Sequence, residues 1–465
     1  MPSITSNPPI LQLPTELKNA IFTELVKITR SSTSLLAPSS ACRDFRDLLL
    51  DAPSLWIHVR IDFKSMRFAE GCGCFPGLRT ILKRSKDRYI SLSIHLEGAN
   101  RTEDSLLQHF ITPAHLTGLT DILSEEGIPA RVRDLAVRCS VFSHIETIMG
   151  FWTRERPLLR LESFMIWFSY GSGLGMLDLD EEDEDLFPTV QCPILVPESA
   201  LDQSTSALVR YSEATLPALE RVFVQGIPMR YRSFFPSYLT TLSLFEVVRL
   251  SAKEFSRILD ANRYSLRVLD LGHDVVPVEA FERRVTLPHL FKLSISVIDP
   301  RELVALAKSV ELPRLSQLSI TDMFNRLRGF EMLLGDGGYT DEEGKSVQDA
   351  FLEMYNVIGG FWSLDKVKKL ILKDIVFYEA EGNAISLLSE SRGNRVDWQV
   401  KGRGVPIASR FFAQFTSLEK LVLSSPDDSV LVAFYNQPYR WDEEEKEFEP
   451  VFGKWFPQLK CLESP

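Results

Sequence analysis

The sequence predicts an α/β solenoid with a curved parallel sheet, preceded by a short helical module. Three observations indicate this architecture. The pattern Leu-x-x-Leu-x-Leu, with apolar substitutes, recurs along most of the 465 residues. Helix-like stretches separate several copies, and apolar residues within residues 10–60 have helical spacing. A chain of this length exceeds one compact core, whereas stacked repeats grow by addition.

The first expected helix begins near Pro14, because proline is favoured in the first turn of a helix. Leu17, Ile21 and Leu25 then recur every four residues and make one apolar stripe. The polar residues of this segment fall largely off the stripe. The helix is therefore expected to bury one face.

A second helix is expected after a serine-rich break at residues 31–34. Ser39 or Ser40 is the expected N-cap, and Pro53 ends the helix because proline disfavours helix in the residue before it. Trp56 then supplies a large apolar anchor. So short a module cannot bury this apolar surface alone, and its face is expected to need a partner.

In this order and spacing, the residues resemble an F-box, as found in many fungal F-box proteins. That pattern has Leu-Pro, a helix with Ile-Phe, a second helix with Val-Cys-Arg-x-Trp-Arg, and Pro-x-Leu-Trp. Ala41 and Phe45 depart from it, since valine and tryptophan are common there, and both changes shrink the apolar contact. The resemblance implies docking on the Skp adaptor subunit of cullin–RING ubiquitin ligases through Leu13, Pro14, Leu17, Ile21, Phe22, Leu25, Cys42, Phe45, Leu55 and Trp56. The alternative is an ordinary helical hairpin packed on the next domain.

Clear copies of the repeated pattern begin at residues 132, 161, 219, 239, 266, 290, 315, 367 and 418. Tyr89 is read as the start of the first copy and Leu459 as that of a truncated last one. The central spacings fit leucine-rich repeats, which are about 20–29 residues long. The phrase Leu-Pro-x-Leu at 216–219, 287–290 and 312–315 fixes the registration.

This part of the chain resembles a degenerate leucine-rich repeat domain. The asparagine of that family is absent, and its place is taken by Val247, Ile298, Met323 and Ile375. Helices that return the chain between strands are expected over Ala252–Ala261, Val278–Arg284 and Arg301–Val310. The alternative is a set of buried strands in an ordinary α/β domain.

The expected domains are the F-box at 10–60, a connecting segment at 61–87 and the repeat domain at 88–465. Acidic insertions lie near 171–215, 334–348 and 427–450. The net charge of −11 argues against nucleic-acid binding, which needs a basic surface. Acidic runs such as Asp178–Asp185 are expected to be solvated, the alternative being docking of a basic partner. Without a targeting signal or an apolar membrane-spanning run, an intracellular location in the cytoplasm or nucleus is expected, with no membrane partner.

The sequence offers no signature of catalysis, metal binding or a cofactor. Nucleophile, zinc-protease and nucleotide motifs are missing, and Gly171–Gly175 reads as a hinge because an acidic stretch follows it. The cysteines have no paired Cys-x-x-Cys spacing, and Cys72-Gly73-Cys74 reads as a loop. We therefore expect a non-catalytic protein.

Side chains between the core leucines are expected on the concave face of the sheet, because side chains of a strand alternate. These candidate substrate-binding residues are Met165, Trp167, Arg221, Phe223, Phe245, Asp270 and Lys292. Large apolar side chains exposed there are typical of a protein-binding site. The alternative is that the insertion at 171–215 covers them.

Two functions follow from the pattern. The first is a substrate-recognition adaptor of an SCF-type cullin–RING ligase, which reaches the cullin and RING subunits through Skp and holds an unknown target protein through its repeats. The second is a non-ligase repeat scaffold whose N-terminal helices cap the solenoid, since terminal repeats need a cap. An enzyme with dispersed catalytic residues is a third, weaker reading.

Overall fold

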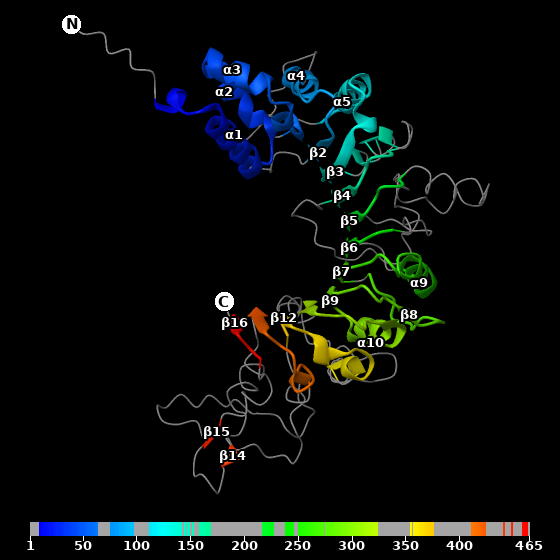
Figure 1. Ribbon diagram of the computed structural model, residues 1–465. Coiled ribbons are helices and arrows are strands. Elements are labelled where there is room, and N and C mark those ends of the chain that lie inside the picture. Colours follow the sequence, from blue (N-terminus) through cyan, green and yellow to red (C-terminus); the bar gives the residue numbers. More distant parts are fainter. Residues whose placement is uncertain are drawn as a thin grey trace, which may run out of the picture. The chain divides into compact units, whose positions relative to one another are not determined.

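The structure, a computed structural model, describes residues 9–63, 75–96, 111–141, 144–145, 147–148, 151–152, 158–168, 216–226, 238–245, 250–273, 275–323, 354–355, 357–375, 411–424, 440–441, 448–449 and 458–463. The chain divides into two units, Met1–Pro236 and Ser237–Pro465. An N-terminal helical region precedes a large, mostly parallel sheet of 12 strands (Figure 1). The expected α/β composition and parallel strand pairing are confirmed at this level.

The helical module packs around a small apolar core. It comprises α1 (Thr15–Thr29), η2 (Ser32–Leu35), α2 (Leu36–Ala41), α3 (Arg43–Leu50) and η3 (Pro53–Trp56). The rings of Phe22 and Phe45 meet edge to face, with their centroids 5.4 Å apart. Trp56 is fully buried, and its Nε1–H donates to the Leu49 carbonyl at 2.8 Å. The short helices therefore stabilise one another through aromatic residues.

The expected second helix is two helices, and the N-cap expected at Ser39 or Ser40 is wrong. Both serines lie inside α2, where their hydroxyls donate to the Leu36 carbonyl. The break comes at Cys42, whose extended backbone ends α2. The Cys42 sulfur then accepts the backbone N–H of Phe45 at 3.5 Å and caps α3.

The first unit contributes five strands, which run in the order of the sequence. They are β1 (His58–Asp62), β2 (Ile90–Leu96), β3 (Val132–Cys139), β4 (Ser163–Phe168) and β5 (Arg221–Gln225). The unit also contains α4 (Pro76–Arg84), α5 (Pro113–Glu125) and η5 (Ile128–Ala130). The sheet begins earlier than expected, because β1 directly follows the helical module. Tyr89 is 49% exposed, and Ile90 takes the buried place opposite Val132.

The second unit contributes seven further strands. They are β6 (Thr241–Phe245), β7 (Val268–Leu271), β9 (Lys292–Val297), β11 (Gln317–Asp322), β12 (Lys369–Lys373), β13 (Lys420–Ser424) and β16 (Cys461–Glu463). Two-stranded pairs join β8 (Val285–Thr286) to β10 (Val310–Glu311) and β14 (Arg440–Trp441) to β15 (Phe448–Glu449), the latter antiparallel. A short turn of helix, η7 (Leu364–Lys366), precedes β12.

Two of the three expected return helices are present. α9 spans Ala252–Ala261, and α10 spans Pro300–Ser309 against β9. The helix expected over Val278–Arg284 is wrong. Only Phe281 is buried near its middle, and its backbone N–H donates to the Ser309 hydroxyl at 2.8 Å. A hydrogen bond to a neighbouring segment thus replaces one within a helix.

Burial follows the repeated sequence pattern closely. In each clear copy the first, fourth and sixth positions are buried, from Val132, Leu135 and Val137 through Leu418, Leu421 and Leu423. The intervening strand residues are mostly half-buried or exposed. The expected shared core is therefore present in each unit, and the alternate side chains form the other face of the strands.

A tight turn leads into most strands of the repeated pattern. The fourth residue of each turn donates its N–H to the carbonyl of the first at 3.1–3.4 Å, in 158–161, 216–219, 287–290, 312–315, 364–367 and 415–418. The phrase Leu-Pro-x-Leu suits this turn, because proline is favoured at its second position. The residue just before a strand often uses its one carbonyl oxygen to accept two N–H groups at the start of the next strand of the sheet, at 2.8–3.2 Å. The residues with such a carbonyl are Glu162, Thr240, Arg267, Phe291, Ser316, Lys368 and Glu419.

Several expectations lie outside the described residues. These are the acidic insertions, apart from residues 440–441 and 448–449, the hinge at 171–175 and the cysteines Cys72, Cys74 and Cys192. Among the helices that the structure describes, none has the length and apolarity needed to cross a membrane.

Candidate functional site

Helix α1 exposes an apolar stripe, which we call the α1 stripe. Leu17, Ile21 and Ile28 are 51%, 44% and 80% exposed. The opposite side of the same helix buries Phe22 and Val26 in the module. The helix is therefore apolar on two sides, and only one of them is covered by the module.

The other expected docking residues divide by burial. Pro14 is exposed, and Leu13, Leu25 and Cys42 are half-buried. Phe22, Phe45, Leu55 and Trp56 are at most 8% exposed. These four side chains hold the module together and are not available on its surface.

The strands of the first unit align their outward side chains in rows. Parallel pairing places Ala136, Met165 and Phe223 in one row. The next row toward the strand ends holds His95, Arg138, Trp167 and Gln225. Side chains at matching positions of neighbouring strands are close enough to touch.

Aromatic and cationic side chains meet where these two rows run side by side. The guanidinium carbon of Arg138 lies 4.0 Å from the Trp167 ring centroid. The Trp167 and Phe223 rings are 6.3 Å apart at a tilt of 49°. Met165 is 40% exposed beside them. We call Arg138, Met165, Trp167 and Phe223 the aromatic patch.

Ion pairs flank the aromatic patch on both sides. Arg221 Nη2 lies 3.0 Å from Asp134 Oδ1, next to Phe223. On the other side Arg60 Nη2 lies 3.0 Å from Asp62 Oδ2, and the Ser93 hydroxyl is 2.8 Å from His95 Nε2. An apolar centre with a polar border is the usual arrangement of a protein-binding surface.

His58 lies at the start of β1, in the row that also holds Asp134. Burial lowers the pKa of its imidazole, while the Asp134 carboxylate raises it and the Arg133 guanidinium lowers it further. The balance favours the neutral ring. His58 therefore behaves as a packed residue of the sheet rather than as a cation on its surface.

The remaining expected site residues belong to the second unit. Asp270 binds the Lys292 ammonium at 3.1 Å and accepts the Ser243 hydroxyl at 3.2 Å. Phe245 packs against the backbone at Gly272, where an added Cβ would lie 2.8 Å from the Phe245 Cα. Within the first unit Met165, Trp167, Arg221 and Phe223 thus lie on adjacent strands, and within the second unit Asp270 and Lys292 form an ion pair.

Sequence reasoning missed some residues of both surfaces. Ile28 was overlooked, although it follows Ile21 by seven residues and so continues the same stripe. Arg60 and Asp62 fall in the expected F-box and connecting segment, where no strand is expected, although both belong to β1. The alternation of Val59 and Ile61 with polar residues was the available signal.

Comparison of the sequence with known proteins identifies no family. No protein-family model matches the chain, and no curated protein matches it significantly. Among the residues that the structure describes, no three histidine, cysteine or acidic side chains are placed to hold a metal ion. The surfaces described above favour binding through apolar contact with a polar border.

Proposed function

We propose that the chain is a substrate-recognition adaptor of a cullin–RING ubiquitin ligase. In this proposal the helical module is an F-box that docks the Skp subunit, and the repeat strands hold a target protein. Ubiquitin transfer belongs to other subunits, so the chain contributes proximity and orientation rather than catalysis. The proposal places the chain inside the cell, in the cytoplasm or nucleus.

The observation that carries the proposal is the exposure of the α1 stripe. Leu17, Ile21 and Ile28 repeat at helical spacing over several turns and are all more than two-fifths exposed. Contiguous apolar surface of this kind marks an interaction site, whereas single exposed leucines are common. The stripe also contains two of the residues that the resemblance to an F-box assigns to Skp docking.

The aromatic patch supports the second half of the proposal. Tryptophan, arginine and other aromatic residues dominate the energetic centres of protein interfaces. Here Trp167, Phe223 and Arg138 are held in contact by parallel strands, so little conformational freedom remains to be lost on binding. A folded or extended segment with an apolar anchor residue fits this surface.

Co-purification of the full chain with a Skp subunit tests the proposal. Leu17→Ser with Ile21→Ser should lower adaptor binding more than tenfold, because both substitutions place polar groups in the interface. Leu159→Ser is the matched control, since Leu159 is 51% exposed but lies outside the helical module. Trp167→Ala with Phe223→Ala should leave adaptor binding unchanged. If the unaltered chain binds no Skp subunit, the ligase proposal is wrong.

A non-ligase scaffold is the second candidate. Its support is the hydrogen bonding that joins the helical module to the first strand of the sheet. The buried Ser32 hydroxyl donates to the Leu55 carbonyl at 2.8 Å and accepts the His58 N–H at 3.2 Å. Helices fixed this way to the first strand could serve as a cap. Full stability without any Skp binding would favour this candidate.

A further inference from the structure

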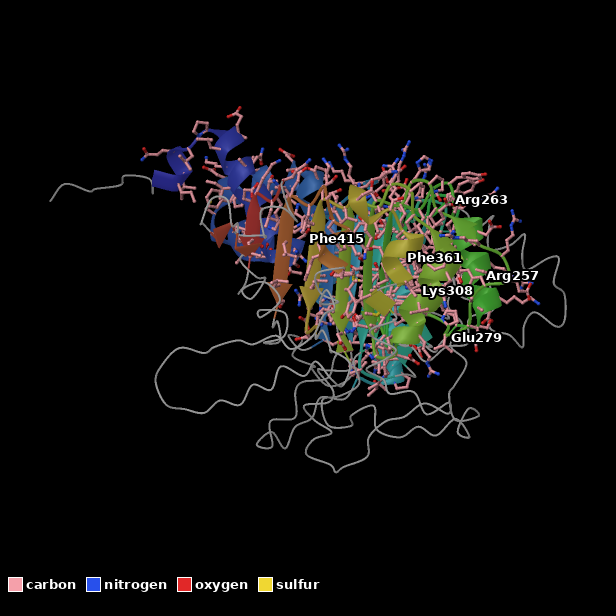
Figure 2. The ribbon with its side chains drawn as sticks, turned by 90° about the horizontal axis from the view of Figure 1, so that it is seen from below. Arg257, Arg263, Glu279, Lys308, Phe361 and Phe415 are labelled. Atoms are coloured by element: carbon pink, nitrogen blue, oxygen red, sulfur yellow. The ribbon has the colours of Figure 1, made fainter. Side chains whose placement is uncertain are left out.

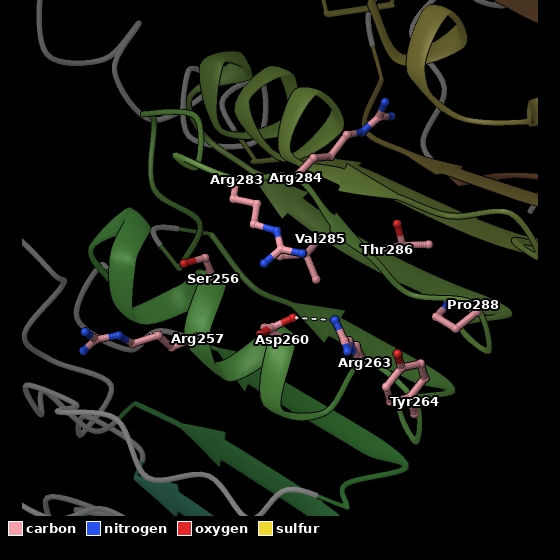
Figure 3. Close-up of a pocket in the computed structure, with 10 residues that line it drawn as sticks. All are labelled: Ser256, Arg257, Asp260, Arg263, Tyr264, Arg283, Arg284, Val285, Thr286 and Pro288. Carbon is pink, nitrogen blue, oxygen red and sulfur yellow. Dashed lines mark hydrogen bonds and ion pairs between the residues drawn. The ribbon is translucent and has the colours of Figure 1, made fainter.

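An open groove lies in the second unit between α9 and the segment that leads into β8 (Figure 3). Its volume is about 420 Å³, which lies within the usual range of ligand sites. The side chains around it come from Ser256, Arg257, Asp260, Arg263, Tyr264, Arg283, Arg284, Val285, Thr286 and Pro288. We call it the arginine groove.

The lining is strongly basic in a chain of net charge −11. It contains four arginines and a single carboxylate, that of Asp260. Arg263 lies 3.4 Å from Asp260, but both side chains are well exposed, so water weakens their attraction. Within the described part of the chain, Arg257 and Arg283 have no ion-pair partner. A second carboxylate lies beside the groove, because Glu311 Oε2 accepts the hydroxyl of the lining residue Thr286 at 2.8 Å. The four arginines of the lining still outnumber these two carboxylates.

Two of the arginines face the interior of the groove. Arg283 reaches down toward the Asp260–Arg263 pair, whereas Arg257 and Arg284 extend away from the centre (Figure 3). Arg284 donates to the Phe361 carbonyl at 3.1 Å and lies over the Phe361 ring. Arg257 and Arg263 project from the same outer side of the unit (Figure 2). An anion in the groove would therefore meet Arg283 and Arg263 first.

The elements that carry these side chains are fixed. A capping box closes the start of α9, where the Ser251 hydroxyl accepts the Glu254 N–H and the Glu254 carboxylate accepts the Ser251 N–H. Asn262 at its end is buried and holds the Leu239 N–H at 2.8 Å. On the other wall β8 pairs with β10. The backbone next to both facing arginines is thus held by hydrogen bonds before any ligand arrives.

We propose that the arginine groove binds a phosphomonoester group. A guanidinium group forms two parallel hydrogen bonds to phosphate oxygens, and the two negative charges of a phosphomonoester balance two guanidinium groups at once. The hydroxyl of Tyr264 adds a polar group to the lining. The phosphate can come from a phosphorylated serine or threonine of a protein, or from a small phosphorylated molecule. The site is distinct from the α1 stripe and the aromatic patch, so it does not depend on the adaptor proposal.

Calorimetric titration of the full chain tests the groove with three probes. They are a five-residue glycine peptide with a central phosphoserine, its unphosphorylated twin and inorganic phosphate. We expect binding of the phosphopeptide and no binding of its twin. Tighter binding of the phosphopeptide than of inorganic phosphate would identify a protein segment as the source. Equal binding would identify a small phosphorylated ligand, and both results support the site.

Substitutions locate the binding within the groove. Arg283→Gln and Arg263→Gln should each weaken phosphopeptide binding at least tenfold. Arg284→Gln is the matched control, because it removes the same charge from a side chain that points away, and it should weaken binding less than threefold. Arg283→Lys should give an intermediate loss, since charge remains without the planar fork. Equal losses for Arg283→Gln and Arg284→Gln, or equal binding of the unphosphorylated twin, would overturn the proposal.

Discussion

The guanidinium carbon of Arg138 lies 4.0 Å from the centre of the Trp167 ring, and the two residues are direct neighbours in the pairing of β3 with β4. This geometry is a cation–π contact. It lays a cation over an indole that would otherwise present its apolar face to water. The contact therefore contributes to the stability of the aromatic patch and places a positive charge within it.

A double-mutant cycle should detect this contact. Arg138→Ala and Trp167→Ala, alone and together, should give a coupling free energy of about 0.5–1 kcal/mol for unfolding in urea. The comparison cycle uses Arg43→Ala with Trp167→Ala, because the Arg43 side chain is 89% exposed in the helical module. A coupling as small as that of the comparison pair would contradict the contact.

Trp56 should matter through packing rather than through docking. Its side chain is fully buried, so Trp56→Ala should lower the free energy of unfolding by about 3–5 kcal/mol. Trp56→Phe keeps most of the volume but removes the hydrogen bond to the Leu49 carbonyl, at a cost of about 1 kcal/mol beyond the lost packing. Thermal unfolding would check both values. A Trp56→Ala variant as stable as the unaltered chain but unable to bind Skp would show that the residue acts at the interface.

Gly226 should resist replacement, whereas Gly118 should accept it. Gly226 has a φ of 69°, and an added Cβ would collide with the Phe168 carbonyl oxygen. Gly226→Ala should therefore destabilise the chain by more than about 1–2 kcal/mol. Gly118 lies inside α5 with open space around it, so Gly118→Ala should stabilise by about 0.5–1 kcal/mol. Chemical denaturation of the two variants would reveal opposite signs, and a shared sign would contradict the backbone geometry at Gly226.

Acid should lower the free energy of unfolding partly through protonation of His58. Burial holds the pKa of His58 below its ordinary value of 6.5 in the folded state, so the unfolded chain takes up the proton first. Stability is unaffected by this residue well above the ordinary pKa and falls as pH drops through it toward the folded pKa. His58→Gln should flatten part of this fall, while His144, whose pKa is also lowered by burial, contributes a further part. Identical pH profiles for His58→Gln and the unaltered chain would refute the assignment.

The regular part of the fold could be predicted because its signals are local and repeated. The three apolar positions of each copy are buried, and α9 has the bounds that its sequence indicates. The structure differs from the expected pattern at three places, and two of them are decided by contacts between segments distant in the sequence. Ser309 captures the backbone of Phe281 and prevents a helix there, and Cys42 caps a helix that serine was expected to cap. Ile90 replaces Tyr89 because a register shift between β2 and β3 follows Ile90.

For the candidate site, the sequence could predict only which side chains of a strand face the same side of the sheet. Strand periodicity assigned Met165, Trp167 and Phe223 to one face, and their placement in adjacent positions required the actual register. The division into two units is not visible in the repeat pattern, and Phe245 belongs to the second of them. The arginine groove joins side chains from α9, the turn after it and the segment before β8. The repeat pattern of the sequence does not indicate that side chains from these three segments line one groove.

The single carbonyls that each accept two N–H groups of the following strand set the register of seven strands locally, whatever the length of chain between the strands. Val297 ends β9 and Gln317 begins β11, whereas Asp322 ends β11 and only Lys369 begins β12, yet the strand pairing continues in unbroken register. Closing a longer loop costs only about 0.6 kcal/mol for each doubling of its length. New segments can therefore be gained or exchanged between β11 and β12 while the sheet stays as it is, which makes this scaffold well suited to diversification.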